Sequence, residues 1–345
     1  RMEMDTLRIQ VVPDMEHAAN EVNVMDVWAK FATLRGQWFT IKKPEGLTFE
    51  YSTDQENWIK IPEEDLRVSA SNKNFTVVLS DLMPSMRYYF RTTALENGAS
   101  DVVRSFETER AEQIPYSNFD LWWLKNGNSP TIGKEQDKYW DSGNEGGASV
   151  KVTPTTEEKT NVIKGSAVKL ASKYVNAVVV KKFASGSLYT GQFGGMNGMT
   201  NVYLNFGIPY SCRPTTLSGY YQYQPKSVDI VNNGYDYLKG KPDSCHIYIA
   251  LTDWSAPFKM DSEKLDYVDL SRKNTSIIAF GELKTDRWMD NYEKFTIQLE
   301  YRDMTRKPTY ILIVASSSKY GDYFTGGDGS TLWIDEFELG FNPIE

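Results

Sequence analysis

The feature that most constrains the fold is an alternation of apolar and polar residues with a period of two. In FTIQLEY (295–301), apolar side chains occupy every second position and polar side chains lie between them, as in a half-buried antiparallel strand. Similar runs rich in β-branched and aromatic residues occur at 27–34, 75–82, 87–94, 201–207, 245–252 and 309–316. Because no stretch carries a sustained helical stripe, the sequence predicts an all-β protein.

Length and composition narrow the classes of partner. A chain of 345 residues predicts two domains. Its net charge of −8 repels phosphate backbones and anionic lipid, so nucleic acid and membrane surfaces are not expected partners. The longest apolar run, YILIVA (310–315), is far shorter than the roughly 20 residues of a membrane span. The chain opens at Arg1 without an apolar leader, and we expect a mature or trimmed fragment.

Cysteine and histidine are scarce. Cys212 and Cys245 form either one disulfide or two buried thiols, and the sequence leaves both alternatives open. With His17 and His246 as the only histidines, a multi-histidine zinc site is excluded, and neither lies in a motif for a Ser-His-Asp triad. Aromatic residues are plentiful instead, at 13% of the chain, and many cluster outside the alternating strands.

The first part of the chain resembles an immunoglobulin-like or fibronectin type III-like sandwich. The resemblance rests on LMPSMRYYFRTTA (82–94), which is similar to that family's tyrosine corner and the aromatic strand after it. It implies that the Tyr88 hydroxyl bonds to the backbone just upstream. The charged connector FETERAEQIP (106–115) follows, so we expect a spacer domain over 1–112 and a second domain over 113–345.

The second part resembles the "putative carbohydrate metabolism domain" family of Bacteroidetes. The segments that carry the resemblance run in order along the chain: SNFDLWW (117–123), YWDSGNEGG (139–147), ASGSLYTGQF (184–193), RPTTLSGYYQYQP (213–225), IIAFGEL (277–283) and SSSKYGDYFTGGDGSTLWIDEFEL (316–339). The resemblance implies a jelly-roll β-sandwich similar to carbohydrate-binding modules, but it implies no particular reaction.

Two carboxylates are candidate metal ligands. SNFD (117–120) and WIDEF (333–337) are similar to calcium signatures near the first and last strands of jelly-roll carbohydrate-binding modules. The resemblance implies a structural calcium held by Asp120 and Asp335, completed by loop carbonyls and water. Asp335 shares the more apolar face of its strand, so the alternative is that it accepts backbone N–H bonds across the sheet.

Sugars require flat aromatic rings beside amides and carboxylates, because they present apolar C–H faces fringed by hydroxyls. The loops KYWDSGNEGG (138–147) and YGDYFTGGDGS (320–330) supply this mixture, and GYYQYQPKS (219–227) and LTDWSAP (251–257) supply parts of it. For each aromatic, core or rim packing is the alternative. The candidate carbohydrate-binding residues are Tyr139, Trp140, Asp141, Asn144, Glu145, Tyr221, Tyr223, Trp254, Tyr320, Asp322 and Tyr323.

Three functions follow from these patterns. We expect first a secreted or cell-surface glycan-binding protein that captures oligo- or polysaccharide, with outer-membrane polysaccharide-utilisation partners. The resemblance implies attachment to a Gram-negative outer membrane through an N-terminal segment outside this chain. The second hypothesis is a glycoside hydrolase with a carboxylate pair such as Asp141 and Glu145, or Asp322 and Asp328. The third is a structural surface or adhesion protein.

Overall fold

The computed structural model describes residues 15–148, 151–176, 181–198, 201–232, 234–264 and 266–344. The expectation about the start of the chain concerns residues outside these ranges. Contacts divide the chain into two compact units, 1–110 and 111–345, with the division two residues before the boundary expected at 112. Every strand pairing described here is antiparallel, and the prediction of an all-β fold is confirmed.

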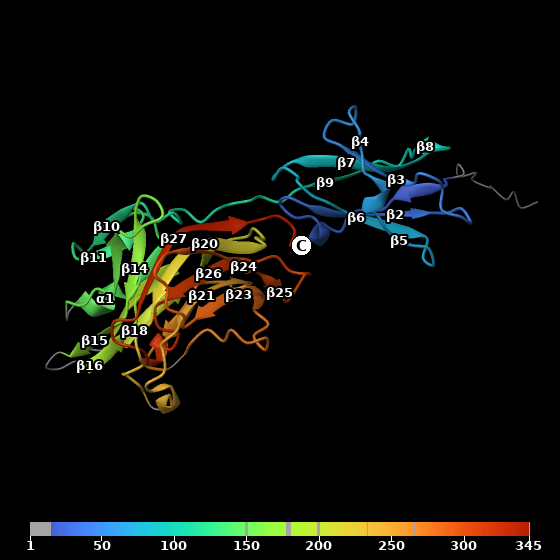
Figure 1. The fold of residues 1–345 in the computed structure, drawn as a ribbon. Helices are drawn as coiled ribbons and strands as arrows, with labels where there is room; N and C mark the ends of the chain where they lie inside the picture. Colours follow the sequence, from blue (N-terminus) through green and yellow to red (C-terminus); the bar gives the residue numbers. More distant parts are fainter. Residues whose placement is uncertain are drawn as a thin grey trace, which may run out of the picture. The chain divides into compact units, whose positions relative to one another are not determined.

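The N-terminal unit consists of two sheets around one apolar core (Figure 1). One sheet has the order β1-β2-β6-β5, and the other has the order β4-β3-β7-β8, with β9 also paired to β7. Their bounds are β1 His17–Ala19, β2 Ala32–Trp38, β3 Thr48–Ser52, β4 Ile59–Lys60, β5 Arg67–Ser69, β6 Asn74–Leu79, β7 Arg87–Ala94, β8 Gly98–Ala99 and β9 Arg104–Glu107, with short 3-10 turns η1 Val24–Asp26 and η2 Glu63–Asp65.

The predicted tyrosine-corner bond is present, because the Met83 N–H donates to the Tyr88 hydroxyl oxygen at 2.9 Å. Kinship with the immunoglobulin-like family stays a prediction. The strand expected over 27–34 begins only at Ala32, and this part of the prediction is wrong. The Trp28 N–H bonds to the Phe31 carbonyl and the two rings stack 5.0 Å apart, so a turn replaces the start of the strand.

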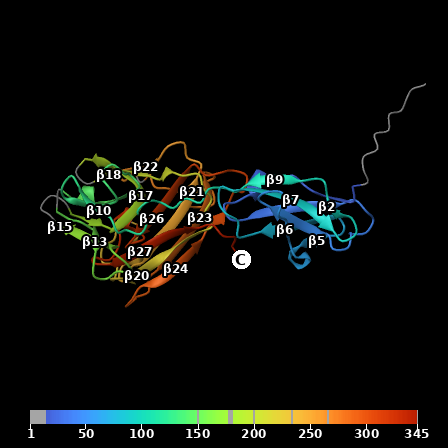
Figure 2. The same ribbon diagram turned by 90° about the horizontal axis from the view of Figure 1, so that it is seen from above.

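The C-terminal unit is a sandwich of a larger and a smaller sheet, whose layers can be followed in Figure 2. The larger sheet has the order β22-β18-β17-β26-β21-β23-β25, with β12 paired to β17 and β19 paired to β26. Its bounds are β12 Trp140–Ser142, β17 Ser187–Asn197, β18 Asn201–Phe206, β19 Ile208–Pro209, β21 Cys245–Thr252, β22 Phe258–Asp261, β23 Ile277–Thr285, β25 Glu300–Tyr301 and β26 Tyr310–Ser316.

The smaller sheet has the order β13-β14-β27-β20-β24, and two short ribbons, β10-β11 and β15-β16, lie outside the two layers. Their bounds are β13 Thr155–Glu158, β14 Ala167–Ala171, β20 Thr216–Gln224, β24 Glu293–Gln298, β27 Thr331–Gly340, β10 Trp122–Lys125, β11 Ser129–Ile132, β15 Lys173–Asn176 and β16 Lys181–Ala184. The helical turns of this unit include α1 Asn144–Gly147, η4 Asp236–Leu238 and η5 Gly321–Tyr323.

Burial explains why the interior strand β21 is mostly apolar instead of alternating between apolar and polar residues. All eight of its residues are buried, because the larger sheet is covered on both faces. Alternate residues such as Tyr248 and Ala250 join an outer apolar cluster with Leu204 and Leu312, and the remaining residues face the smaller sheet. Cys245 lies at the start of this strand; both cysteines are buried thiols, and no disulfide joins them. Among the described residues, no helix is long and apolar enough to cross a membrane.

Candidate functional site

The glycine-rich loop before β27 turns sharply around η5. The Phe324 N–H bonds to the Gly321 carbonyl, and Phe324 itself adopts a left-handed conformation with φ of 54°. A Cβ at Gly321 would lie 2.3 Å from the Cβ of Ser185, so only glycine fits this close approach. The turn brings Asp322 and Phe324 to the wall of a cavity.

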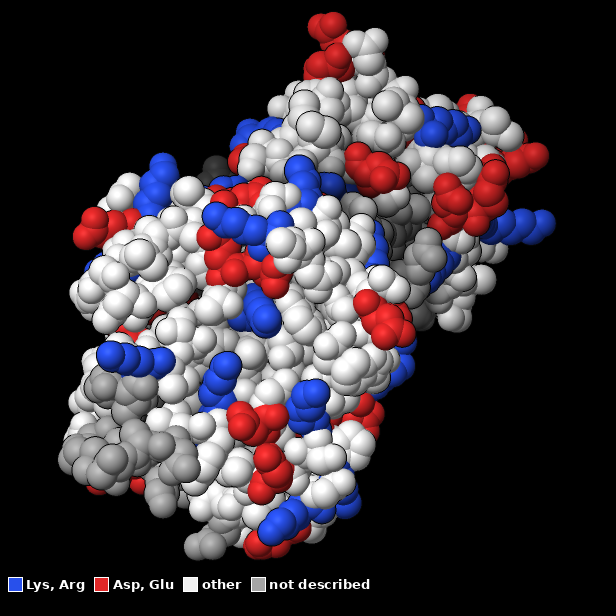
Figure 3. All heavy atoms as spheres, turned by 60° about the vertical axis from the view of Figure 1, so that its left-hand side comes forward, with Lys and Arg blue, Asp and Glu red and all other residues white. Residues whose placement is uncertain are grey.

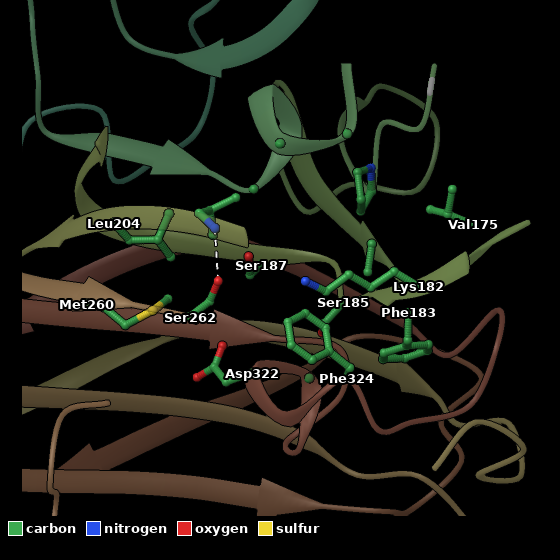
Figure 4. Close-up of a pocket in the computed structure, with 17 residues that line it drawn as sticks. Val175, Lys182, Phe183, Ser185, Ser187, Leu204, Met260, Ser262, Asp322 and Phe324 are labelled. Carbon is green, nitrogen blue, oxygen red and sulfur yellow. Dashed lines mark hydrogen bonds between the residues drawn. The ribbon is translucent and has the colours of Figure 1, made fainter. Parts of the chain in front are cut away.

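This cavity has a volume of about 150 Å³, close to that of engineered protein cavities that bind a benzene ring. The two glycine-rich loops singled out in the sequence meet here, because Gly143, Gly146 and Gly147 of the first loop also line it. Figure 4 shows side chains from both sides of the hollow pointing into it. Its walls are mainly apolar: Val175, Phe183, Val202, Leu204, Met260 and Phe324.

Two ionisable groups stand at the cavity wall. Burial lowers the pKa of Lys182 to about 8, and its ammonium lies 3.7 Å from the ring centroid of Phe324. Asp322 keeps access to solvent, yet the protein atoms around it remove part of its hydration and raise its pKa to about 6. Within the described lining, Asp322 is the one carboxylate.

Five tyrosines form a cluster beside this cavity, and we call Tyr235, Tyr237, Tyr267, Tyr320 and Tyr323 the tyrosine cluster. Ring centroids lie 5.0 Å apart for Tyr235 and Tyr323, 5.3 Å for Tyr235 and Tyr320, and 4.7 Å for Tyr267 and Tyr323. Tyr237 is 58% exposed, and the other four are partly exposed. The Tyr267 hydroxyl donates to the Asp322 carbonyl at 2.5 Å, which joins the cluster to the cavity wall.

The first glycine-rich loop has a different environment. Trp140 is 2% exposed, and its indole N–H donates to the Pro115 carbonyl at 2.9 Å, so its ring has no face open to a ligand. The Lys125 ammonium lies 2.9 Å from Asp141 and 3.1 Å from Glu145. The buried Asn144 amide is fully used, since it exchanges two hydrogen bonds with the Thr155 backbone and donates a third to Pro130.

The four other predicted aromatics are dispersed. Tyr221 and Tyr223 are buried, and the Tyr223 hydroxyl donates to the Ser317 carbonyl at 2.9 Å. Trp254 is half-buried against Phe258 beside the outer apolar cluster. Tyr139 is partly exposed and lines a separate groove. Burial therefore removes Trp140, Tyr221 and Tyr223 from the residues that can stack on a sugar in this structure.

The two candidate calcium ligands hold one loop. The Ile163 and Lys164 N–H groups donate to Asp335 at 2.7 and 3.2 Å, and the Ser166 N–H donates to Asp120 at 2.8 Å. Burial raises the pKa of Asp335, and the backbone N–H bonds partly oppose this rise. Within the described part of the chain, no three His, Cys, Asp or Glu side chains gather around one point. The backbone role expected as the alternative for Asp335 is present, and calcium binding stays a prediction.

Sequence reasoning placed Tyr320, Asp322 and Tyr323 beside each other but missed their neighbours. Tyr235 and Tyr237 belong to NNGYDYLKG (232–240), where two tyrosines flanked by glycines repeat the composition of the recognised loops. That composition was an available signal. Lys182 and Tyr267 carry no comparable signal, because only the packing of separate segments brings them to the site.

Comparison with known protein families shows that the C-terminal unit is a carbohydrate-related β-sandwich domain. The family described as "Putative carbohydrate metabolism domain" matches residues 105–340, most of the chain. The protein therefore belongs to this family. No curated protein matches the chain.

Two solved structures of Bacteroides proteins are similar to it. One, from Bacteroides thetaiotaomicron and described as a putative glycoside hydrolase, shares 20% identity with a TM-score of 0.51, covering 98% of this chain and 100% of its own. Another, from Bacteroides vulgatus and described in the same words, shares 22% identity with a TM-score of 0.46 over 68% of this chain and 96% of its own. The first of these likenesses shows a common fold.

Proposed function

We propose that the cavity and the tyrosine cluster together form a saccharide-binding site, and that the protein is a secreted or cell-surface glycan-binding protein. The observation that carries the proposal is the hydrogen bond from Tyr267 to the Asp322 carbonyl, which connects the partly exposed tyrosine cluster to the wall of a ring-sized cavity. Tyrosine faces suit the apolar face of a sugar, and Asp322 is an acceptor for its hydroxyl groups.

The distribution of surface charge is consistent with a ligand that is uncharged or carries charges of both signs. On the face shown in Figure 3, basic and acidic side chains are interspersed among wide uncharged areas. Such a surface gives no broad field of one sign to steer a polyanion. Capture of oligo- or polysaccharide at the cell surface fits these features and the family to which the chain belongs.

Glycoside hydrolysis is the second candidate, favoured by the raised pKa of Asp322, since a general acid must hold its proton near neutral pH. Hydrolysis by the common mechanisms requires two carboxyl groups across the scissile bond. The described cavity lining supplies one. The pair Asp141 and Glu145 is held by Lys125, and Asp328 accepts the Tyr174 N–H, so binding without catalysis is the better supported proposal.

The test measures binding of a glycan array, followed by calorimetry on the best ligand, for the intact chain and for Tyr320→Ala/Tyr323→Ala. We expect the double substitution to weaken binding at least tenfold, because each ring contributes on the order of 1 kcal/mol of stacking. Trp288→Ala, which removes a 51% exposed ring outside the cluster, is the control and should leave affinity unchanged.

Unchanged affinity in the tyrosine double variant would contradict the proposed site. Release of reducing sugar by the wild type that is lost in Asp322→Asn would replace the binding proposal with hydrolysis. No binding to any glycan would leave the third hypothesis, a structural or adhesion protein.

A further inference from the structure

A groove lies beside strands β17 and β18. It is on the face of this strand pair opposite to the outer apolar cluster. Its volume is about 510 Å³, more than three times that of the cavity. Its lining includes Asp137, Tyr139, Gln192, Asn205, Pro209 and Pro257. We call it the amide groove.

Two amides form a matched pair on its floor. Gln192 on β17 lies directly opposite Asn205 on β18 in the strand register. Their neighbours Phe193 and Leu204 pack into the outer apolar cluster, so strand alternation places the two amides on the opposite face. Both side chains are partly exposed, and neither makes a hydrogen bond with the described residues.

Glycines keep this floor open. Gly191 has φ of +139°, and a Cβ there would lie 2.2 Å from the Asn205 carbonyl oxygen. A Cβ at Gly194 would lie 3.0 Å from the Asn205 side-chain nitrogen. Side chains at these positions would therefore crowd the backbone or the amide of Asn205.

An aromatic ring and a carboxylate stand beside the amides. The Tyr139 carbonyl accepts the Gly191 N–H at 3.1 Å, which fixes this segment against β17. The Tyr139 ring lies 6.2 Å from that of Tyr116, and the Tyr116 hydroxyl donates to Asp137 at 2.5 Å. Tyr139 is thus held in place while staying partly exposed.

We propose that the amide groove binds a neutral, hydroxyl-rich saccharide at a site separate from the cavity. An amide offers both donors and an acceptor, as a sugar hydroxyl does, and a charged group offers one kind alone. Two amides beside a tyrosine ring supply both parts of saccharide recognition, and the groove has room for more than one sugar ring. The inference depends on this groove's own residues and not on the tyrosine cluster.

The experiment uses the full chain and a panel of neutral tetra- to hexasaccharides of glucose, xylose, mannose and galactose, measured by calorimetry. Gln192→Ala/Asn205→Ala should weaken binding of the best ligand about tenfold, since each polar contact contributes on the order of 1 kcal/mol. Tyr139→Ala should act in the same direction. Gln298→Ala, an exposed amide on β24, is the matched control and should bind as the wild type does.

Tyr320→Ala/Tyr323→Ala separates the two sites, because binding in the groove should survive that change. Loss of all binding in the tyrosine variant, with wild-type affinity in the amide variant, would overturn the groove and leave the first site standing. Failure of every neutral oligosaccharide to bind would also overturn it. If the amide variant does not fold, the wild type is titrated with the best oligosaccharide and followed by NMR. The side-chain NH₂ signals of Gln192 and Asn205 should then shift, and unshifted signals would overturn the proposal.

Discussion

The glycine-rich loops at 139–147 and 320–330 have almost the same composition but different environments. In the first, Trp140 is buried, and Asp141 and Glu145 are held by one lysine. In the second, the tyrosines keep exposed faces and Asp322 stands at the wall of a cavity. Glycine, aromatic and acidic residues in one loop are therefore compatible with either a packed anchor or an open surface, and the neighbouring segments decide which.

The largest expected difference between the loops is in stability. Trp140→Ala should lower the free energy of unfolding by about 4 kcal/mol, because it removes a fully enclosed ring that packs against Phe119 at 5.5 Å. Tyr320→Ala, in the other loop, should cost less than about 1 kcal/mol. Denaturant unfolding of both variants measures the two values, and equal losses would contradict the comparison.

The lysine of the first loop gives the next largest effect. Lys125→Met leaves the buried Asp141 carboxylate without its ion pair and should lower the free energy of unfolding by about 3 kcal/mol. Lys159→Met is the matched control, since the Lys159 side chain is 70% exposed and its ion pair with Glu157 should contribute below about 1 kcal/mol. If Lys125→Met left the free energy of unfolding unchanged, the ion pairs of Lys125 would not be what stabilises the first loop.

The smallest effect concerns Asp322 and pH. Its pKa in the folded protein, about 6, lies above the value of an unfolded aspartate, so the folded state binds the proton more tightly between these two values. Wild-type stability should therefore fall as pH rises from about 4 to about 6, and Asp322→Asn should remove this loss. Because Asp322 is open to solvent, we expect a gain in Tm of about 1 °C at pH 7 and none at pH 4.

Calorimetric scans at both pH values measure this difference. Asp236→Asn, which removes an exposed carboxylate on η4, is the control substitution. If Asp322→Asn raised Tm more at pH 4 than at pH 7, Asp322 would not be a partly desolvated carboxyl.

Strands were predictable from sequence because their pattern is local. The expected strands at 87–94 and 245–252 coincide with β7, which is rich in aromatic and β-branched residues, and with β21, which is mostly apolar and buried throughout. The run 295–301 is divided instead, since β24 pairs in the smaller sheet and β25 in the larger, with the Leu299 N–H bonded to Thr215 between them. The point at which a chain passes from one sheet to the other depends on distant strand partners. It therefore does not show in the alternation of apolar and polar residues.

The site was only partly predictable for the same reason. Composition identified Tyr320, Asp322 and Tyr323, but it gave Trp140 the same weight, although the ring lies in the core. Tyr267 and Lys182 reach the site through packing between segments more than 50 residues apart in sequence, as with Tyr267 and Asp322, which are 55 apart. Long-range proximity of this kind has no local signature.

The tyrosine cluster is built from loops and not from strands. Its rings come from three connections, around 235–237, 267 and 320–323, all outside the strands of the two sheets. A substitution or insertion in one connection can reshape the aromatic surface while the strand pairing beneath it is kept. If the cluster binds saccharide as proposed, its preference can therefore change one loop at a time without a change in the scaffold.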